Sequence, residues 1–234
     1  MRIVAVADTH LYHRELRVPD GDVFVHAGDL CRSGHVRELA IALDWIGELP
    51  HRRKVVVAGN HDWAFAREPA AALALLPKSV DYLQDAGVDI GGVRFWGSPW
   101  QPEFGGWAFN LPRGKALAAR WASIPERVDV LVTHGPPRGI GDRTSTSQRE
   151  GCDQLLARVS VLGPSLHLFG HIHEDGGAWE VGATWFANVT TWECERAPSV
   201  FDIDVATKRV TPVNVPPRRG DEADTFDPAE SRTR

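Results

Sequence analysis

The sequence has few cysteines. Among its 234 residues only Cys31, Cys152 and Cys194 are present. The number is odd and no two of them form a CxxC pair, which argues against a disulfide framework and against a thiolate zinc knuckle. Such cysteine usage is typical of a protein in a reducing compartment.

Long hydrophobic runs are also missing. No stretch reaches the roughly 20 apolar residues that a membrane-spanning helix needs. The first residues, 1–8, read MRIVAVAD and contain neither a long apolar segment nor a cleavage site for a secretory signal. We therefore expect a cytoplasmic protein without a membrane partner.

Positive charge is scarce. The chain has 26 Lys and Arg against 31 Asp and Glu, for a formal net charge of -5. A protein that binds a long polyanion usually presents a basic face, and no Lys/Arg-rich run occurs before the C-terminal residues. Stable binding of nucleic acid is therefore disfavoured. Oligomeric state is left open by the sequence.

What is present is ordinary globular composition, with 43% hydrophobic and 24% charged residues. The length suits one domain with a buried core. We expect a single domain over residues 1–215. Residues 216–234 carry Pro, Gly and charges with almost no apolar side chains, which predicts a disordered tail.

Short β-branched runs bounded by Gly, Pro and Asp predict buried strands. Five such runs are residues 3–7, 23–27, 54–58, 128–132 and 166–169. Helical patterns lie between them, at 36–46, 70–76, 115–122 and 154–162, and further short strands are expected at 93–96, 178–181, 184–189, 200–203 and 210–213. The alternation predicts an α/β fold with a mixed sheet or two packed sheets flanked by helices. Residues 97–112 hold too many Gly and Pro for regular structure and predict an aromatic loop or lid.

Each of the five runs ends in a polar cluster. The clusters contain Asp8 and His10, then Asp29, then Asn60-His61-Asp62, then His134, and finally His171 and His173. Ligand sites collect outside the carboxyl ends of strands in open α/β sheets, so residues spread along the chain can converge there.

These residue types suit divalent metals. Imidazole nitrogens and carboxylate oxygens bind Mn, Fe, Zn and related ions. A carboxylate can bridge two ions with its two oxygens, and Asp29, alone at its strand end, suits that role. Two ions about 3.5–4 Å apart can clamp both sides of an in-line displacement at phosphorus.

The five motifs occur in the order Asp8-x-His10, Gly28-Asp29, Gly59-Asn60-His61-Asp62, Thr133-His134 and Gly170-His171-Ile172-His173. This set resembles that of the calcineurin-like metallophosphoesterases and spans most of the chain. The segments 94–102, 133–137 and 151–152 are similar to the small metallophosphoesterase-domain branch that includes the MPPED group of animals.

The resemblance implies a four-layer α-β-β-α sandwich of two mixed sheets flanked by helices. It assigns Asp8, His10, Asp29 and His173 to a first metal, and Asp29, Asn60, His134 and His171 to a second. Manganese is the expected ion, with Fe, Zn, Ni or Co as alternatives. His61 is expected to be a catalytic group that does not bind metal and instead assists the leaving oxygen.

The implied activity is hydrolysis of phosphoesters by a metal-bridged hydroxide. Phosphodiesters, cyclic nucleotides and phosphomonoesters all fit the same pair of ions, and diesters are favoured. Two alternatives stay open: a nucleotide-binding or scaffold protein with little turnover, and a nuclease, which the acidic chain disfavours.

Residues outside the ligand set are open as well. Arg32 lies one position earlier than the substrate-binding arginine of many relatives, and Trp100 in the aromatic loop could stack on a nucleobase. Asp62 could orient His61. Among the other histidines, His26 and His167 are expected to be packed, and the solvated ones are His13, His35 and His51.

Overall fold

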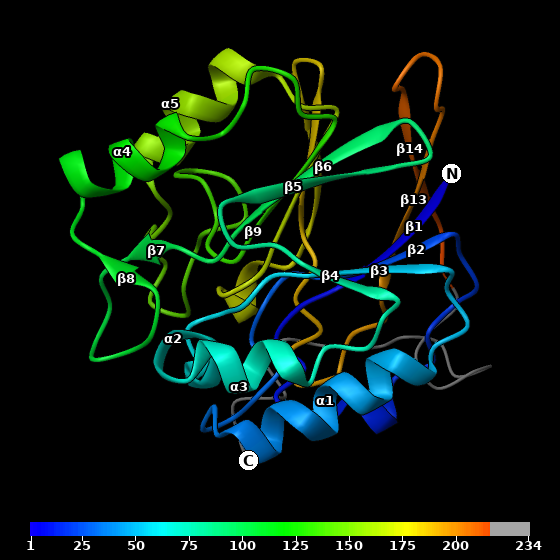
Figure 1. Ribbon diagram of the computed structural model, residues 1–234. Coiled ribbons are helices and arrows are strands. Elements are labelled where there is room, and N and C mark those ends of the chain that lie inside the picture. The colour runs from blue at the N-terminus through cyan, green and yellow to red at the C-terminus, as the bar shows by residue number, and fades with distance from the viewer. Residues whose placement is uncertain (216–234) are drawn as a thin grey trace.

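The computed structural model describes residues 1–215, so the expected tail at 216–234 lies outside the described residues (Figure 1). Two six-stranded mixed sheets form the centre. In spatial order, the first contains β14 (Val210–Val213), β13 (Ser199–Ile203), β1 (Arg2–Val6), β2 (Val23–His26), β3 (Arg53–Val56) and β4 (Val80–Tyr82). The second contains β11 (Gly177–Val181), β12 (Thr184–Asn188), β10 (Leu166–Phe169), β9 (Val130–Thr133), β6 (Val93–Ser98) and β5 (Ala86–Ile90).

Each sheet has a block of parallel strands. These are β1 to β4 in the first sheet, and β6, β9, β10 and β12 in the second. The antiparallel strands lie beside these blocks: β13 and β14 in the first sheet, β5 and β11 in the second. Within each block the carboxyl ends therefore lie at one edge, where a ligand site is expected.

Helices cover the outer face of each sheet. α1 (Val36–Glu48), α2 (Trp63–Arg67) and α3 (Pro69–Ala74) pack on the first sheet, and α4 (Lys115–Ala122) and α5 (Asp153–Leu162) pack on the second (Figure 1). Two 3-10 turns, η1 (His13–Glu15) and η2 (His173–Asp175), complete the elements. The expected four-layer α-β-β-α sandwich is confirmed.

Alternation along the strands builds two kinds of core. In β1, Ile3 and Ala5 pack between the sheets, whereas Val4 and Val6 face the layer of α1. All four are fully buried, as a strand that is covered on both faces requires. Burying one such aliphatic side chain contributes about 1.5–3 kcal/mol.

Local chemistry fixes the helix ends. The carboxylate of Glu38, in the first turn of α1, accepts the N–H groups of Arg32, Ser33 and Gly34. The turn that follows Asp29 is thereby tied to α1. In the second sheet's layer, α5 stops at Gly163, whose φ of +57° is the left-handed conformation that favours glycine.

Several elements differ from expectation. β4, β5 and α2 are not predicted by the sequence pattern, and the expected loop at 97–112 contains the end of β6 and a small parallel pair, β7 (Gln101–Pro102) and β8 (Asn110–Leu111). The helices in the described part of the chain are all too short or too polar to cross a membrane.

Two histidines expected to be solvated are buried. His13 is 1% exposed and its ring stacks on Trp45, with centroids 4.7 Å apart. His51 is 2% exposed and packs against Phe24. The prediction was wrong because their apolar partners lie far away in sequence. His35 is exposed, as expected.

Candidate metal centre

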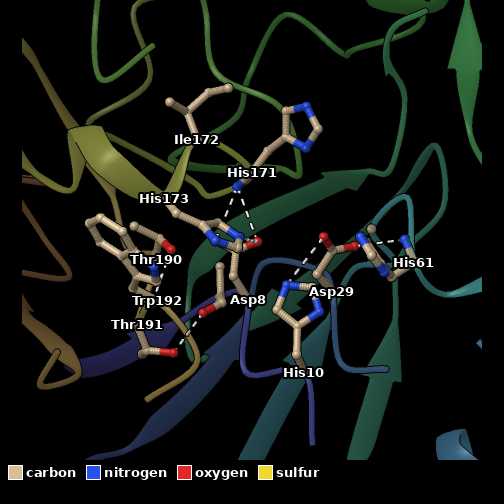
Figure 2. A network of polar contacts seen from close by, with 12 residues as sticks. Asp8, His10, Asp29, His61, His171, Ile172, His173, Thr190, Thr191 and Trp192 are labelled. Atoms are coloured by element: carbon tan, nitrogen blue, oxygen red, sulfur yellow. Dashed lines mark hydrogen bonds and ion pairs between the residues drawn. The ribbon is translucent and has the colours of Figure 1, made fainter. Parts of the chain in front are cut away.

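The carboxyl ends of the two sheets meet directly. The N–H of Ala7, after β1, donates to the carbonyl of Val189, after β12, at 2.9 Å. The Thr191 hydroxyl donates to the Ala7 carbonyl at 2.9 Å (Figure 2). Residues that follow β1, β2 and β3 are thereby placed opposite residues that follow β9 and β10.

All seven candidate ligands lie in this region. Figure 2 labels Asp8, His10, Asp29, His171 and His173 among them. One cluster of donor atoms joins Asp8, His10 and His173, and another joins Asp29, His134 and His171, with all atoms of a cluster within 4.8 Å of one another. Asn60 extends the second cluster, because its Oδ1 lies 2.9 Å from His134 Nε2. The structure thus brings the seven together as two adjacent groups.

Asp29 lies between the two groups. Its Oδ2 is 3.8 Å from His10 Nε2, on the side of the first cluster. Its Oδ1 is 3.4 Å from His134 Nε2, on the side of the second. One carboxylate therefore presents a separate oxygen to each cluster, which is the arrangement that a bridge between two ions needs.

Backbone carbonyls orient two of the imidazoles. His10 Nδ1 bonds to the carbonyl of Cys31 at 2.9 Å, and His134 Nδ1 bonds to the carbonyl of Ala27 at 3.0 Å. A carbonyl can only accept, so each Nδ1 carries the hydrogen. When the ring is neutral, its lone pair is then on Nε2, the atom that faces Asp29, and metal-binding histidines are commonly held in this way.

The backbone at the site is strained. Four non-glycine residues among the candidate ligands have positive φ: Asp8 (+56°), His10 (+42°), Asp29 (+58°) and His171 (+73°). Each such conformation costs on the order of 1–3 kcal/mol and persists where the surrounding structure requires it. The N–H of His171 shows one reason, since it donates to both carboxylate oxygens of Asp8 at 3.1 Å (Figure 2).

Two glycines are required by close packing around Asp29. A Cβ at Gly28, whose φ is +104°, would lie 2.3 Å from His134 Nδ1. A Cβ at Gly59 would lie 2.2 Å from Asp29 Oδ1. The glycines in the Gly-Asp and Gly-Asn pairs therefore have a steric function at the ligand groups.

Asp62 braces the turns that carry these ligands. Its buried carboxylate accepts N–H groups from Asp29, Leu30, Cys31 and Gly59, at 2.7–3.3 Å. Burial, then the charge of Asp29, raises the pKa of Asp62 to about 6. The sequence left open a role for Asp62 in orienting His61, but the bonds of Asp62 hold the backbone after β2 and β3 instead.

His61 lies at the edge of the first cluster. Its Nδ1 bonds to the carbonyl of Arg32 at 2.6 Å, and its ring contacts His10 edge-on, with centroids 4.7 Å apart. The indole of Trp107 lies over the ring at 4.0 Å. His61 also joins His10 and Asp29 in a third group of donor atoms, so a ligand role competes with the expected catalytic role.

The two expected substrate contacts lie outside the ligand clusters. The guanidinium of Arg32 lies over the ring of Tyr12, 5.2 Å from its centroid. Trp100 donates its indole N–H to Asp85 at 2.8 Å and carries the guanidinium of Arg120 on its ring at 4.4 Å. In the aromatic segment, Trp107 contacts a histidine of the site and Trp100 does not. No feature of the sequence distinguished these two tryptophans.

His26 and His167 are packed, as expected. Both are fully buried, and burial lowers the pKa of each to about 3. His26 bonds through Nε2 to the Thr9 hydroxyl at 2.9 Å, and His167 bonds through Nε2 to the Thr133 hydroxyl at 2.8 Å. They support the segments from which Asp8 and His134 extend.

The site is electrostatically prepared for cations. Asp8 and Asp29 are 0% and 2% exposed, and their ion-pair partners are His10, His134 and His173. Burial lowers the pKa of His134, but Asp29 and Asp8 outweigh burial and raise it to about 9. The pKa of His171 is lowered to about 3, first by burial and then by the charge of His134.

The donor set fits divalent transition metals. Buried carboxylates are costly unless cations compensate them, and here they face imidazole nitrogens held at hydrogen-bonding and ion-pair distances. Oxygen and imidazole ligands without thiolates suit Mn, Fe, Zn, Co or Ni. The three residues of each cluster together with Asn60 would provide ligands for two ions, with Asp29 shared between the ions.

Comparison with known sequences agrees with this geometry. The family model of the calcineurin-like phosphoesterases matches residues 1–175. The chain is 40% identical over 230 residues to metallophosphoesterase domain-containing protein 1 of Homo sapiens, and the match covers 86% of this chain and 71% of the human protein. The protein of the same name from Mus musculus matches to the same extent.

A solved structure shares the fold. TT1561 of Thermus thermophilus superposes with a TM-score of 0.60 at 17% identity, covering 91% of this chain and 98% of that one. The similarity in sequence and the family match together identify the chain: it belongs to the calcineurin-like phosphoesterase family.

Proposed function

We propose that the protein is a binuclear metal-dependent phosphoesterase that hydrolyses phosphodiesters. The observation that carries the proposal is the position of Asp29, which directs one carboxylate oxygen to His10 and the other to His134. One bridging carboxylate between two clusters of neutral and anionic donors is the arrangement that a pair of divalent ions requires.

The ligand assignment follows the two clusters. Asp8, His10, His173 and Asp29 would hold the first ion, and Asp29, Asn60, His134 and His171 the second. When bound, the ions neutralise charge on the phosphoryl oxygens and make water a better nucleophile near neutral pH. Manganese is the ion we expect in a cytoplasmic setting, because carboxylate, amide and imidazole ligands are all acceptable to it.

His61 would act on the leaving oxygen. The carbonyl of Arg32 fixes a hydrogen on its Nδ1, so Nε2 is the atom available for proton transfer. Trp107 and His10 contact the ring and limit its rotation. A general acid of this kind contributes about 10²–10⁴-fold to the rate.

Arg32 and Trp100 are proposed only as contacts to the substrate. Arg32 is exposed and lies directly beyond the turn that carries Asp29, so its guanidinium could reach a phosphoryl oxygen after leaving Tyr12. Trp100 would have to expose its ring, which now lies against Arg120 and Phe109. Replacing either with Ala should then raise KM.

A panel of esters assayed with each metal tests the proposal. It should contain phosphomonoesters, 2′,3′- and 3′,5′-cyclic nucleotides and open diesters, each with Mn²⁺, Zn²⁺, Co²⁺ or Ni²⁺. The proposal predicts a higher kcat/KM for diesters than for monoesters of the same alcohol. A reversed preference would contradict the diester assignment and leave the phosphoesterase class intact.

The second candidate is a nucleotide-binding or scaffold protein with little turnover. His171 is present and lies with Asp29 and His134 in the second cluster, and this favours catalysis. Binding of a nucleotide to the metal-loaded chain without hydrolysis of any ester in the panel would instead support the scaffold.

A further inference from the structure

A cavity of about 160 Å³ lies beside the second ligand cluster, and His171 forms part of its wall. Its apolar lining is Pro102, Phe104, Pro136 and Ile172. In Figure 2 the side chains of His171 and Ile172 extend to the same side, away from Asp8. The cavity therefore adjoins the candidate metal centre and shares His171 with it.

Phe104 is an unusual wall for this cavity. Its side chain is 61% exposed although it is a large aromatic residue. Its backbone is nevertheless held, because Asn110 donates to the carbonyls of Phe104 and Gly105 at 2.8 and 3.3 Å. The ring is edge-on to His171, with centroids 6.3 Å apart. An exposed aromatic ring on a fixed turn next to a reaction centre is suited to cover a ligand.

The size of the cavity limits the ligand. An apolar cavity of roughly 150 Å³ accommodates a benzene molecule. A cavity of about 160 Å³ therefore has room for one six-membered ring.

The charge at the rim limits it further. Glu150 is paired with Arg113, whose guanidinium also donates to the carbonyls of Glu150 and Gly151. Glu103, in contrast, has no ion pair within the part of the chain that the structure describes. An uncompensated carboxylate at the rim repels an anionic substituent.

We infer that this cavity is the subsite for the substituent that stays on phosphorus, and that it selects a single-ring, uncharged group. The inference rests on the proposed function. His61, which is assigned to the leaving oxygen, contacts His10 and Trp107, whereas the cavity adjoins His171. The leaving group would therefore lie on the side of His61, and the retained group on the side of His171.

Two esters with the same leaving group isolate the retained one. They are p-nitrophenyl phenylphosphonate and p-nitrophenyl methylphosphonate, which release the same phenolate and leave phenylphosphonate or methylphosphonate. The wild-type chain should show a kcat/KM at least about tenfold higher for the phenyl ester, since one buried apolar ring is worth that much or more.

Phe104→Ala should lower the phenyl preference to about twofold while leaving kcat/KM for the methyl ester near the wild-type value. Because the side chain of Phe104 is exposed, its removal should not unfold the chain, and a lower phenyl preference would not be due to loss of folding. Leu73→Ala, which removes a 48% exposed side chain on α3, is the matched control and should preserve the preference.

Glu103→Gln tests the charge at the rim. The wild-type chain should bind 4-carboxyphenylphosphonate at least about threefold more weakly than phenylphosphonate, because the added carboxylate faces Glu103. The substitution should reduce that difference. An unchanged difference would overturn the selection by charge.

The closing experiment measures binding by calorimetry, with phenylphosphonate and methylphosphonate titrated into the metal-loaded chain. Tighter binding of the phenyl compound that disappears in Phe104→Ala supports the subsite. Equal affinities for phenylphosphonate and methylphosphonate would overturn the subsite, whether or not the chain hydrolyses the esters. If no ester of the phosphoester panel is hydrolysed but the phenyl preference in binding persists, the proposed function fails and the subsite stands.

Discussion

The indole of Trp107 lies over the imidazole of His61, with ring centroids 4.0 Å apart and an angle of 31° between the planes. The carbonyl of Arg32 holds Nδ1 of the same imidazole, and His10 contacts it edge-on. Trp107 is itself anchored, because the next residue, Ala108, donates its N–H to the carbonyl of Asn60 at 3.1 Å. The aromatic segment thus positions the proposed catalytic group.

Trp107→Ala should lower kcat by about tenfold while KM and metal content stay near wild type. The reason is that His61 would sample more orientations, and misplacement of a positioned group costs rate more than binding. Trp107→Phe retains a ring over His61 and should recover most of the loss. Steady-state kinetics with bis-p-nitrophenyl phosphate, together with metal analysis, measures all three quantities.

Trp100→Ala is the matched control for the loss of an indole. Trp100 bonds to Asp85 and packs against Phe109, so its removal should lower the free energy of unfolding and raise KM while leaving kcat unchanged. If Trp100→Ala reduced kcat as strongly as Trp107→Ala, the contact between Trp107 and His61 would have no special role.

His61→Ala should keep two metal ions per chain and lose about 10²–10⁴-fold in kcat, the range expected for a missing general acid. Metal content by atomic emission and turnover of a diester are the two measurements. Because His61 also lies within a group of donor atoms with His10 and Asp29, loss of one ion in the variant would identify it as a ligand.

Asp62→Asn should lower the free energy of unfolding by about 2–4 kcal/mol, since an amide NH₂ would face backbone N–H groups that the carboxylate now accepts. Asp81→Asn is the control: Asp81 pairs with Arg53 in a partly exposed position, where an ion pair is worth about 0–1 kcal/mol. Urea unfolding of both variants compares them. Equal losses would show that Asp62 does not brace the site.

The sequence predicts those helices and strands whose own residue pattern matches the structure that they adopt in the fold. β10 and α4 have the expected bounds, because the run of β10 ends before Gly170 and the amphipathic run of α4 ends before Ser123. β4 and β5 were missed since Val80–Tyr82 is only three residues long and Ala86–Ile90 contains Gly87 and Asp89, which weaken a strand pattern. Their stability comes from neighbours β3 and β6.

The candidate site was predictable for a related reason. Asp8, Asp29, Asn60 and His134 each follow a recognisable strand, so their convergence could be expected from the strands alone. The contacts of Trp107 with His61 and of Asp62 with the Asp29 turn depend on long-range packing. No spacing or composition signals such contacts, and they became visible only in three dimensions.

His167→Gln should flatten the dependence of stability on pH. Burial lowers the pKa of His167 from 6.5 to about 3, so between these values the unfolded chain holds a proton that the folded chain excludes. Stability contributed in this way is present above pH 6.5 and is lost as pH falls, at about 1.4 kcal/mol per pH unit. Gln can still donate to Thr133 but does not titrate.

The measurement is the free energy of urea unfolding between pH 4 and pH 7, for the wild type and His167→Gln. The slope should be smaller in the variant by about 1.4 kcal/mol per pH unit. Parallel curves for the two chains would show that His167 is protonated to the same extent in the folded and unfolded states.

Phosphoester hydrolysis is proposed to depend on two ions bound around Asp29. The most direct measurement titrates the metal-free chain with Mn²⁺ while recording both bound metal and the rate of bis-p-nitrophenyl phosphate hydrolysis. Binding should saturate at two ions per chain, and turnover should rise as the second ion binds. A chain that holds two ions and hydrolyses no ester, or one that is equally active without metal, would contradict this dependence.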